Sequence, residues 1–268
     1  MANKGQFEVY AIRYAERNAR TRADSFIFDD HRSEPHGMDY FIWLVRNDQH
    51  TFLVDTGYDS REAANRGRPV LIDPPAALSA IGVDPAQIDG IIVTHLHYDH
   101  AGGLAHFAGK RIHMQAAEMA YATGPCMCYD AMRAPFTADH VCEAVQRLYS
   151  GLVTFHQGDA EIVPGLTVHL IGGHSKGLQS VRVETAHGPV VLASDAAHYY
   201  ENYEFRKPFP IVADVPEMLR GFDRLRVLAG EGGTIVPGHD PLVRERFPAV
   251  FENSGVDVRR LDGSGSGR

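Results

Sequence analysis

Short apolar runs separated by polar segments recur along the chain and predict β-strands interrupted by a few helices. Residues 7–12 alternate between apolar and polar side chains, which is typical of a half-buried strand. Residues 90–94 instead form a short apolar run, which is typical of a strand covered on both faces. The predicted strands are 7–12, 40–45, 51–57, 90–94, 166–171, 179–184, 189–194 and 233–239.

Helix signals are strongest in three segments. Asp214 precedes a proline and an apolar face at helical spacing, which predicts a helix over residues 215–229. Similar signals predict helices over residues 73–82 and 137–149. Residues 15–37 are polar and aperiodic, so we expect a long loop with a functional role. Because clusters of strands alternate with single helices in both halves, we expect an α/β protein with two sheets packed face to face and helices outside.

Composition and charge narrow the class of protein. The chain has 268 residues, and its 34 acidic side chains against 26 Lys and Arg give a net charge of −8. This acidity and the lack of a long basic run argue against a nucleic acid or an anionic membrane as partner, and favour a small-molecule substrate. No apolar run approaches the length of about 18 residues that a membrane helix needs.

The cysteines and the C-terminal residues add two expectations. The chain has three cysteines, an odd number that does not suit a disulfide framework, so we expect a reducing compartment and a cytoplasmic protein. Residues 261–268 have the composition of a linker, which predicts a flexible tail.

Histidine is the most informative residue type. The chain has 15 histidines, so a bound metal would be held by imidazole and carboxylate ligands. The densest group, Thr-His-Leu-His-Tyr-Asp-His-Ala-Gly-Gly, directly follows the predicted strand 90–94. His95 and His97 lie two positions apart on an extended segment, so their side chains point the same way and can converge on one ion. Asp99 and His100, in the following turn, can reach a second point close by.

Three further metal-ligand residues follow later apolar runs. His174, Asp195 and His239 each lie among small residues at the end of a predicted strand. Small residues let the backbone approach closely while a ligand is exposed at the edge of a sheet. If these residues join the first cluster, ligands from both halves meet at one place. We therefore expect a single domain over residues 1–260.

The cluster His-Leu-His-Tyr-Asp-His, followed in order by His174, Asp195 and His239, resembles the metallo-β-lactamase superfamily. The resemblance implies a four-layer αββα sandwich and a pair of metal ions. It implies that Asp195 bridges the two ions and that Asp55 supports a ligating imidazole. The implied ligands are His95, His97 and His174 for the first ion, Asp99, His100 and His239 for the second, and Asp195 for both.

The ligand set favours one group of enzymes within this superfamily. No cysteine lies near the ligand segments, unlike the branch that destroys β-lactam antibiotics with a cysteine ligand. The motifs Gly173-His174-Ser175-x-Gly177-x-x-Ser180 and Ser194-Asp195-Ala196-Ala197 most resemble those of N-acyl-homoserine lactonases and of the related pyridoxolactonases and γ-butyrolactone hydrolases. This resemblance implies hydrolysis of a lactone or a similar cyclic ester. The alternative is a thioester hydrolase of the glyoxalase II type, or an amide hydrolase, using the same ions. Redox members usually carry Glu in place of His97 and an attached flavin domain, and neither is present.

One position departs from the lactonase pattern. Those enzymes typically place a tyrosine three residues after the bridging Asp, whereas this chain has His198, followed by Tyr199 and Tyr200. We expect His198 to contact the substrate, with Tyr199 or Tyr200 as alternatives.

The implied mechanism is attack by a hydroxide that bridges the ions, with Asp99 passing a proton to the leaving alkoxide. Zinc is the expected ion, although iron, manganese or cobalt also accept such ligands. A homodimer is a further expectation.

Overall fold

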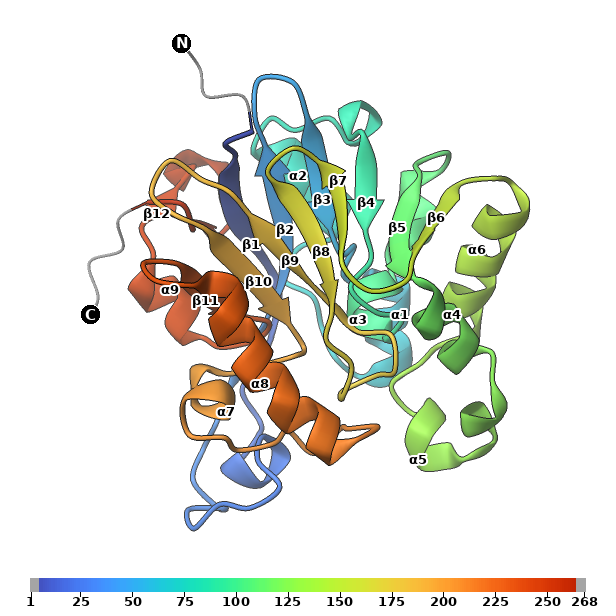
Figure 1. Cartoon of the computed structure of the whole chain (residues 1–268), viewed down its shortest axis with the longest axis vertical. Helices are drawn as coiled ribbons and strands as arrows, with labels where there is room; N and C mark the ends of the chain where they lie inside the picture. Colours follow the sequence, from blue (N-terminus) through green and yellow to red (C-terminus); the bar gives the residue numbers. More distant parts are fainter. Residues whose placement is uncertain (1–4, 264–268) are drawn as a thin grey trace.

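The computed structural model describes residues 5–263 and contains two β-sheets packed face to face, with helices on both outer surfaces (Figure 1). The larger sheet consists, in spatial order, of β12 (Ala249–Val250), β13 (Val258–Arg260), β1 (Glu8–Arg17), β2 (Met38–Arg46), β3 (Thr51–Val54), β4 (Gly90–Ile92), β5 (Ile112–Gln115) and β6 (Val153–His156). The smaller sheet consists of β11 (Thr234–Pro237), β10 (Val190–Ser194), β9 (Gln179–Val183), β8 (Leu166–Leu170) and β7 (Ala160–Val163). The predicted αββα sandwich is confirmed.

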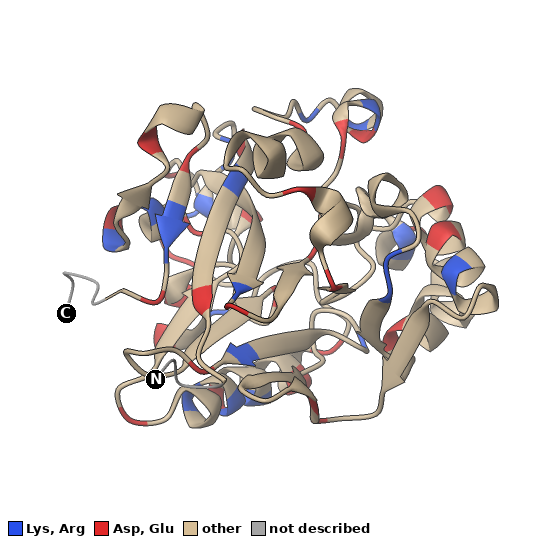
Figure 2. Ribbon diagram, turned by 90° about the horizontal axis from the view of Figure 1, so that it is seen from above, with Lys and Arg blue, Asp and Glu red and all other residues tan. Residues whose placement is uncertain are grey.

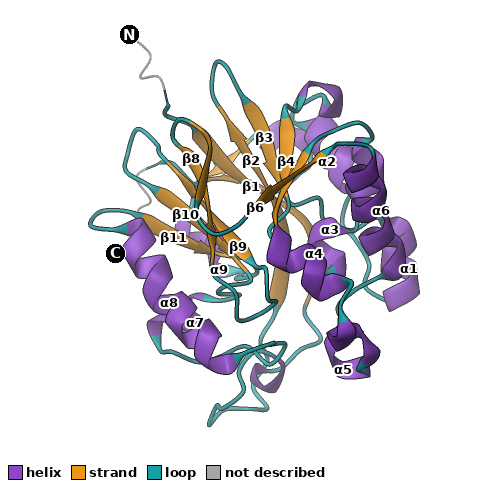
Figure 3. Cartoon of the chain, turned by 45° about the vertical axis from the view of Figure 1, so that its right-hand side comes forward, coloured by secondary structure: helices purple, strands orange, loops and turns teal. Residues whose placement is uncertain are grey.

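Helices cover the outer face of each sheet (Figure 3). The helices are α1 (Ser60–Arg66), α2 (Pro74–Ala80), α3 (Tyr98–Ala101), α4 (Ala116–Ala122), α5 (Asp130–Arg133), α6 (Ala138–Tyr149), α7 (Tyr200–Glu204), α8 (Val215–Ala229) and α9 (Leu242–Arg246). Helix α8 packs on β10 and β11 of the smaller sheet, while α2, α4 and α6 pack on strands of the larger one. No helix within residues 5–263 is both long and apolar enough to cross a membrane.

Strand β2 shows why the central strands are apolar along their whole length. Phe41, Trp43 and Val45 pack between the sheets with valines of the smaller sheet, whereas Ile42 and Leu44 pack under the helices. Successive side chains of a strand point to opposite faces, so a strand buried on both faces needs apolar residues at every position. The two sheets are thus joined by a continuous apolar layer, and this layer fixes where their ends meet.

Helix α8 has the bounds that the sequence predicts. The side chain of Asp214 accepts a hydrogen bond from the backbone N–H of Glu217, which satisfies one of the free donors of the first turn. Met218, Phe222 and other residues on one face are buried against the smaller sheet. This packing holds the helix beside the loop that follows β8.

Several elements differ from the sequence prediction. Strand β1 extends to Arg17, well into the predicted loop of residues 15–37, because Tyr14 and Ala15 are buried although charged residues flank them. Leu261 and Asp262 do not belong to a flexible tail: Leu261 is buried, and its backbone N–H donates to the carbonyl of Val9. Residues 264–268, the rest of the predicted tail, lie outside the described residues.

Strand direction gathers several chain segments at one end of the sandwich. Strands β3, β4, β5 and β6 run parallel to one another, and β10 runs parallel to β11. The loops after β4, β8, β10 and β11 therefore lie together, at the lower end of the sheets in Figure 3. Ligand sites in α/β folds form at such strand ends.

Candidate metal centre

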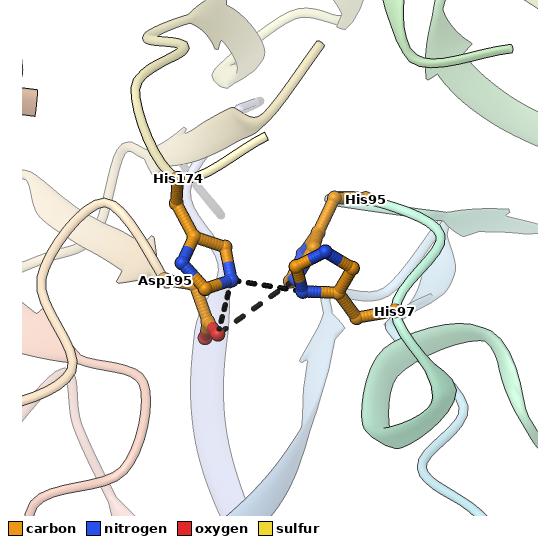
Figure 4. Close-up of side chains that lie close together, drawn as sticks. All are labelled: His95, His97, His174 and Asp195. Atoms are coloured by element: carbon orange, nitrogen blue, oxygen red, sulfur yellow. Dashed lines mark hydrogen bonds and ion pairs between the residues drawn. The ribbon is translucent and has the colours of Figure 1, made fainter. Parts of the chain in front are cut away.

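The predicted ligand residues from both sheets lie together at this end of the sandwich. His95 and His97 follow β4, whereas His174 and Asp195 follow strands of the smaller sheet (Figure 4). One atom from each of these four residues lies within 4.8 Å of the others. A second group of the same kind contains Asp99, His100 and His239. The structure thus brings together all seven residues that the sequence pointed to.

The two carboxylate oxygens of Asp195 face different groups of imidazoles. Its Oδ2 lies 3.1 Å from His174 Nε2 and 3.7 Å from His95 Nε2. Its Oδ1 lies 3.2 Å from His100 Nε2 and 3.0 Å from His239 Nε2. A single carboxylate therefore stands between two sets of nitrogen atoms, which is the arrangement of a bridging ligand.

The outward-facing ring nitrogens of these histidines are held by oxygen acceptors. His174 Nδ1 donates to the carbonyl oxygen of Ile211 at 2.7 Å, and His239 Nδ1 donates to that of Asp39 at 2.9 Å. His100 Nδ1 donates to Asp55 Oδ2 at 2.7 Å. A neutral imidazole has one N–H, so donation at Nδ1 leaves a free lone pair on the Nε2 that faces the cluster.

Asp55 fixes the loop that carries the histidines. It is fully buried and accepts hydrogen bonds from the backbone N–H and the hydroxyl of Thr94, both at 2.7 Å, in addition to the bond from His100. Its φ of 58° lies in the left-handed region, where a residue other than glycine is strained. The expected support of a ligating imidazole by Asp55 agrees with this geometry.

Buried polar atoms without partners test whether the residues suit a metal pair. His95 Nε2, His100 Nε2 and Asp195 Oδ1 are buried and lack a hydrogen-bond partner in the structure. Orphaned buried polar atoms are rare in native proteins, because each one costs the free energy of its lost hydration. Here all three atoms point into the cluster, so they suit divalent cations with nitrogen and oxygen ligands.

Burial keeps two imidazoles of the first group, those of His95 and His97, neutral. Burial, together with the neighbouring His100 and His97, holds the pKa of His95 well below its ordinary value. Burial and the neighbouring His174 lower the pKa of His97 in the same way. Neutral imidazole is the form that binds metals, so both rings are ready to act as ligands at neutral pH.

Glu118 is hydrogen-bonded to both loops that carry the histidines of the first group. Its role was not predicted from the sequence. This buried residue of α4 accepts hydrogen bonds from the backbone N–H of Leu96, from the Ser175 hydroxyl and from the backbone N–H of Gly177. It thereby ties the His95–His97 segment to the loop carrying His174. An acidic residue in an ordinary helix carries no sequence signal for such a role, since the role depends on packing between distant segments.

Gly173 lets the His174 loop approach α8. Its φ is +81°, and a Cβ there would lie 2.5 Å from the backbone of Met218. No larger residue suits this backbone conformation and space. The glycines before His174 thus place the ligand loop directly on the helix.

A small cavity of about 50 Å³ opens onto the cluster. Of the three residues considered for substrate contact, His198 lines this cavity, whereas Tyr199 and Tyr200 are not among its lining residues. Tyr199 instead donates its hydroxyl hydrogen to the carbonyl of Gly37. The ring of His198 stacks on Phe209 at 3.4 Å between centroids, and its Nε2 lies 2.9 Å from Asp195 Oδ2.

His198 also belongs to a third possible ligand group, with Asp195 and His239. Burial lowers its pKa to about 3, against the opposing effect of Asp195, so the ring is neutral at neutral pH. The geometry therefore offers two roles to this residue: contact with substrate, or contact with an ion.

The fold and this cluster together define the protein's class. A family model described as the metallo-beta-lactamase superfamily matches residues 38–239, which include every candidate ligand. The chain belongs to this superfamily.

Several similar proteins within the superfamily are described as N-acyl homoserine lactonases. An N-acyl homoserine lactonase of a Bacillus species is 30% identical over 232 residues, covering 80% of this chain and 86% of the relative. The N-acyl homoserine lactonase AiiA of Bacillus thuringiensis subsp. kurstaki is 30% identical, covering 79% and 84%. Among solved structures, a quorum-quenching N-acyl homoserine lactone lactonase superposes with a TM-score of 0.72 at 24% identity, covering 90% of this chain and 95% of the other.

Proposed function

We propose that this protein is a binuclear metal-dependent hydrolase that opens the ring of a lactone or a similar cyclic ester. The observation that carries the proposal is Asp195, whose two oxygens face two separate sets of buried imidazoles. The similarity to curated N-acyl homoserine lactonases supports the reaction class. The proposed ligands are His95, His97, Asp99, His100, His174, Asp195 and His239.

We propose zinc as the resident ion at both positions. Imidazole and carboxylate ligands suit zinc, and they also accept iron, manganese or cobalt. A pair of bound divalent ions would lower the pKa of water so that hydroxide forms near neutral pH, and would polarise the lactone carbonyl. Proton transfer and hydrogen bonding to the substrate are the roles of the protein's own side chains.

Asp99 and His198 are the proposed catalytic residues. Hydroxide adds to the acyl carbon, the ring C–O bond breaks, and a proton goes to the ring oxygen, so the product is a hydroxy acid. The carboxylate of Asp99 lines the cavity and lies 3.8 Å from His239 Nε2, where it can carry that proton to the ring oxygen. His198 Nε2, beside Asp195 Oδ2, is placed to donate a hydrogen bond to the oxygen that gains negative charge.

Metal removal and a substrate panel test the proposed function. Purified protein is expected to hold about two ions per chain by elemental analysis and to hydrolyse lactones of several ring sizes, with a thioester as comparison. Dialysis against a chelator should abolish hydrolysis, and added zinc should restore it. One tightly held ion with no lactone hydrolysis would contradict the proposal, whereas preference for the thioester would support the glyoxalase II-type alternative.

Replacing His198 by phenylalanine separates its two possible roles. Phenylalanine keeps the stacking on Phe209 but removes both ring nitrogens. We expect kcat to fall by about 100-fold, the effect of losing one donor to a developing oxyanion, while two ions per chain remain bound. Loss of an ion would instead identify His198 as a ligand, and an unchanged kcat would exclude it from the reaction.

The expected partner and location belong to the same proposal. A small lactone is the proposed partner, without nucleic acid and with a homodimer as the assembly. The odd number of cysteines, three, does not suit a disulfide framework and supports a reducing, cytoplasmic location as part of the proposal. Sedimentation tests the homodimer, and cell fractionation tests the cytoplasmic location.

A further inference from the structure

Three arginines line the same cavity as the candidate metal ligands. Arg17 and Arg20 come from the end of β1 and the segment after it, and Arg68 follows α1. Among the described residues, the carboxylates that line this cavity are those of Asp99 and Asp195, which are proposed ligands. Lys and Arg are otherwise interspersed with Asp and Glu around the molecule (Figure 2). The cavity therefore concentrates positive charge in a protein whose net charge is −8.

Arg20 is the most deeply placed of the three. It is 8% exposed, and its Nε is buried without a hydrogen-bond partner. Its other nitrogens donate to neutral groups: the carbonyl of Asp24, the hydroxyl of Ser25 and the sulfur of Met38. Its guanidinium lies 5.9 Å from the centre of the Phe209 ring, the ring on which His198 stacks. Arg20 thus lies beside the ring on which His198 stacks and forms no ion pair within residues 5–263, while the carboxylate of Asp24, whose pKa is lowered by the Thr21 backbone N–H and also by Arg20, lies in its surroundings.

Arg68 and Arg17 complete the set. Arg68 donates to the hydroxyl of Tyr98 and lies over its ring. Arg17 is partly buried. Within residues 5–263, no carboxylate lies within ion-pair distance of these three arginines. Two other partly buried cations are paired: Arg22 with Glu201 and Lys207 with Asp29.

We propose that the lactone opened by this enzyme carries a carboxylate, which Arg20, Arg17 and Arg68 bind while the ring lies at the metal pair. This inference rests on the proposed lactonase function. A buried charge without a partner is costly, so such charges are normally paired. The planar fork of a guanidinium matches a carboxylate, to which it can make two parallel hydrogen bonds. A carboxylate on the substrate would supply the anion that the cavity lacks.

The neutral acyl-homoserine lactones named for the relatives carry no group that needs three cations. A carboxylate on the substrate would therefore distinguish the lactone opened by this protein from the lactones named for the relatives.

The test compares two γ-butyrolactones that differ in one group. One carries a carboxylate on the γ-carbon, and the other carries the uncharged primary amide at the same carbon. For the metal-loaded enzyme we expect kcat/KM to favour the carboxylate by about 10- to 100-fold, the range for a charge-assisted hydrogen bond. We expect Arg20→Gln to reduce this preference to below about threefold by lowering kcat/KM for the carboxylate alone.

Arg111→Gln is the matched control, because this exposed arginine precedes β5 at the end of the sheet away from the cluster and loses the same charge. It should keep the full preference. If Arg20→Gln fails to fold, Arg68→Gln should give a smaller loss in the same direction.

Binding supplies a readout that does not need turnover. Tetrahydrofuran-2-carboxylate keeps the five-membered ring and the carboxylate of the test lactone. It lacks the ring carbonyl, so the enzyme can bind it but cannot hydrolyse it. It should raise the melting temperature of the wild type more than its amide does, and Arg20→Gln should remove that difference.

The outcomes separate the inference from the proposed function. Hydrolysis of the amide as fast as the carboxylate, or an equal loss of both in Arg20→Gln, would overturn the inference and leave the lactonase proposal standing. If the metal-loaded enzyme hydrolyses neither lactone nor any other in the panel, the proposed function fails and the inference fails with it.

Discussion

Replacing Asp195 by asparagine is expected to lower kcat/KM for lactone hydrolysis by more than about 1000-fold and to reduce bound metal below two ions per chain. Loss of a residue that merely supports a ligand costs about 10- to 100-fold in metal affinity or activity, so loss of a shared ligand should cost more. Asparagine has nearly the same size but only one acceptor oxygen. Its NH2 group would face the nitrogens of one imidazole set, either His174 and His95 or His100 and His239.

Asp262→Asn is the control for this change. Asp262 is also buried, and its Oδ1 accepts a hydrogen bond from the backbone N–H of Val9, a role that an amide oxygen can keep. This variant should retain two ions and full activity. Elemental analysis and initial rates on the same preparations measure both effects, and an Asp195→Asn protein with two ions and an unchanged rate would exclude the bridging role.

Replacing Asp55 by asparagine should lower the affinity for one ion by about 10- to 100-fold while preserving the fold. Asparagine tolerates the left-handed backbone conformation that Asp55 adopts, so the loop is not expected to rearrange. Its amide oxygen can still accept from the backbone of Thr94, but its NH2 group then faces His100 Nδ1. His100 would accept at Nδ1 and carry its proton on Nε2, the nitrogen that faces Asp195, and would lose the lone pair needed for an ion.

Asp59→Asn is a matched control, since Asp59 also contacts a histidine, His106, at 2.9 Å, but on the surface. Asparagine also caps helices well, so α1 should keep its first turn. Competition with a chromophoric chelator should resolve one tight and one weakened site in Asp55→Asn and two tight sites in Asp59→Asn. Equal affinities in the two variants would show that the tautomer of His100 does not control binding.

The sequence predicted well which histidines and aspartates lie together, because the signal is local. The five residues 95–99, directly after a buried strand, contain His95, His97 and Asp99, and extended-chain geometry alone places the first two side chains together. The later ligands His174 and Asp195 follow recognisable apolar strands, so the ends of those strands could be located before their partners were known. For the same reason the two-sheet architecture was predictable.

A functional role was expected for the polar stretch 15–37, but which of its residues line the cavity was not predictable. Arg17 at the end of β1 and Arg20 after it show no periodic pattern, and only the folded path from β1 to β2 brings them to the cavity. Arg206 and Lys207, in the segment after α7, are not among the lining residues of this cavity and pair with Asp223 and Asp29, respectively.

Some strands were missed because their composition is ambiguous. Strand β5 reads Ile-His-Met-Gln and β6 reads Val-Thr-Phe-His, and each alternates between apolar and polar residues over only four positions, which is the shortest length at which alternation indicates a strand. Their pairing with β4 and with each other is parallel, so their partners lie far along the chain. Tertiary contacts decide the conformation of such segments more than local propensity does.

The proposed ligands come from both sheets, and the last of them, His239, follows β11 near the end of the described chain. During synthesis, a nascent chain that ends after β9 already contains the dense histidine segment but lacks Asp195 and His239. Such a chain would offer an ion only some of the proposed ligands. Complete binding of two ions would therefore require residue 239 to be made and the second sheet to pack on the first.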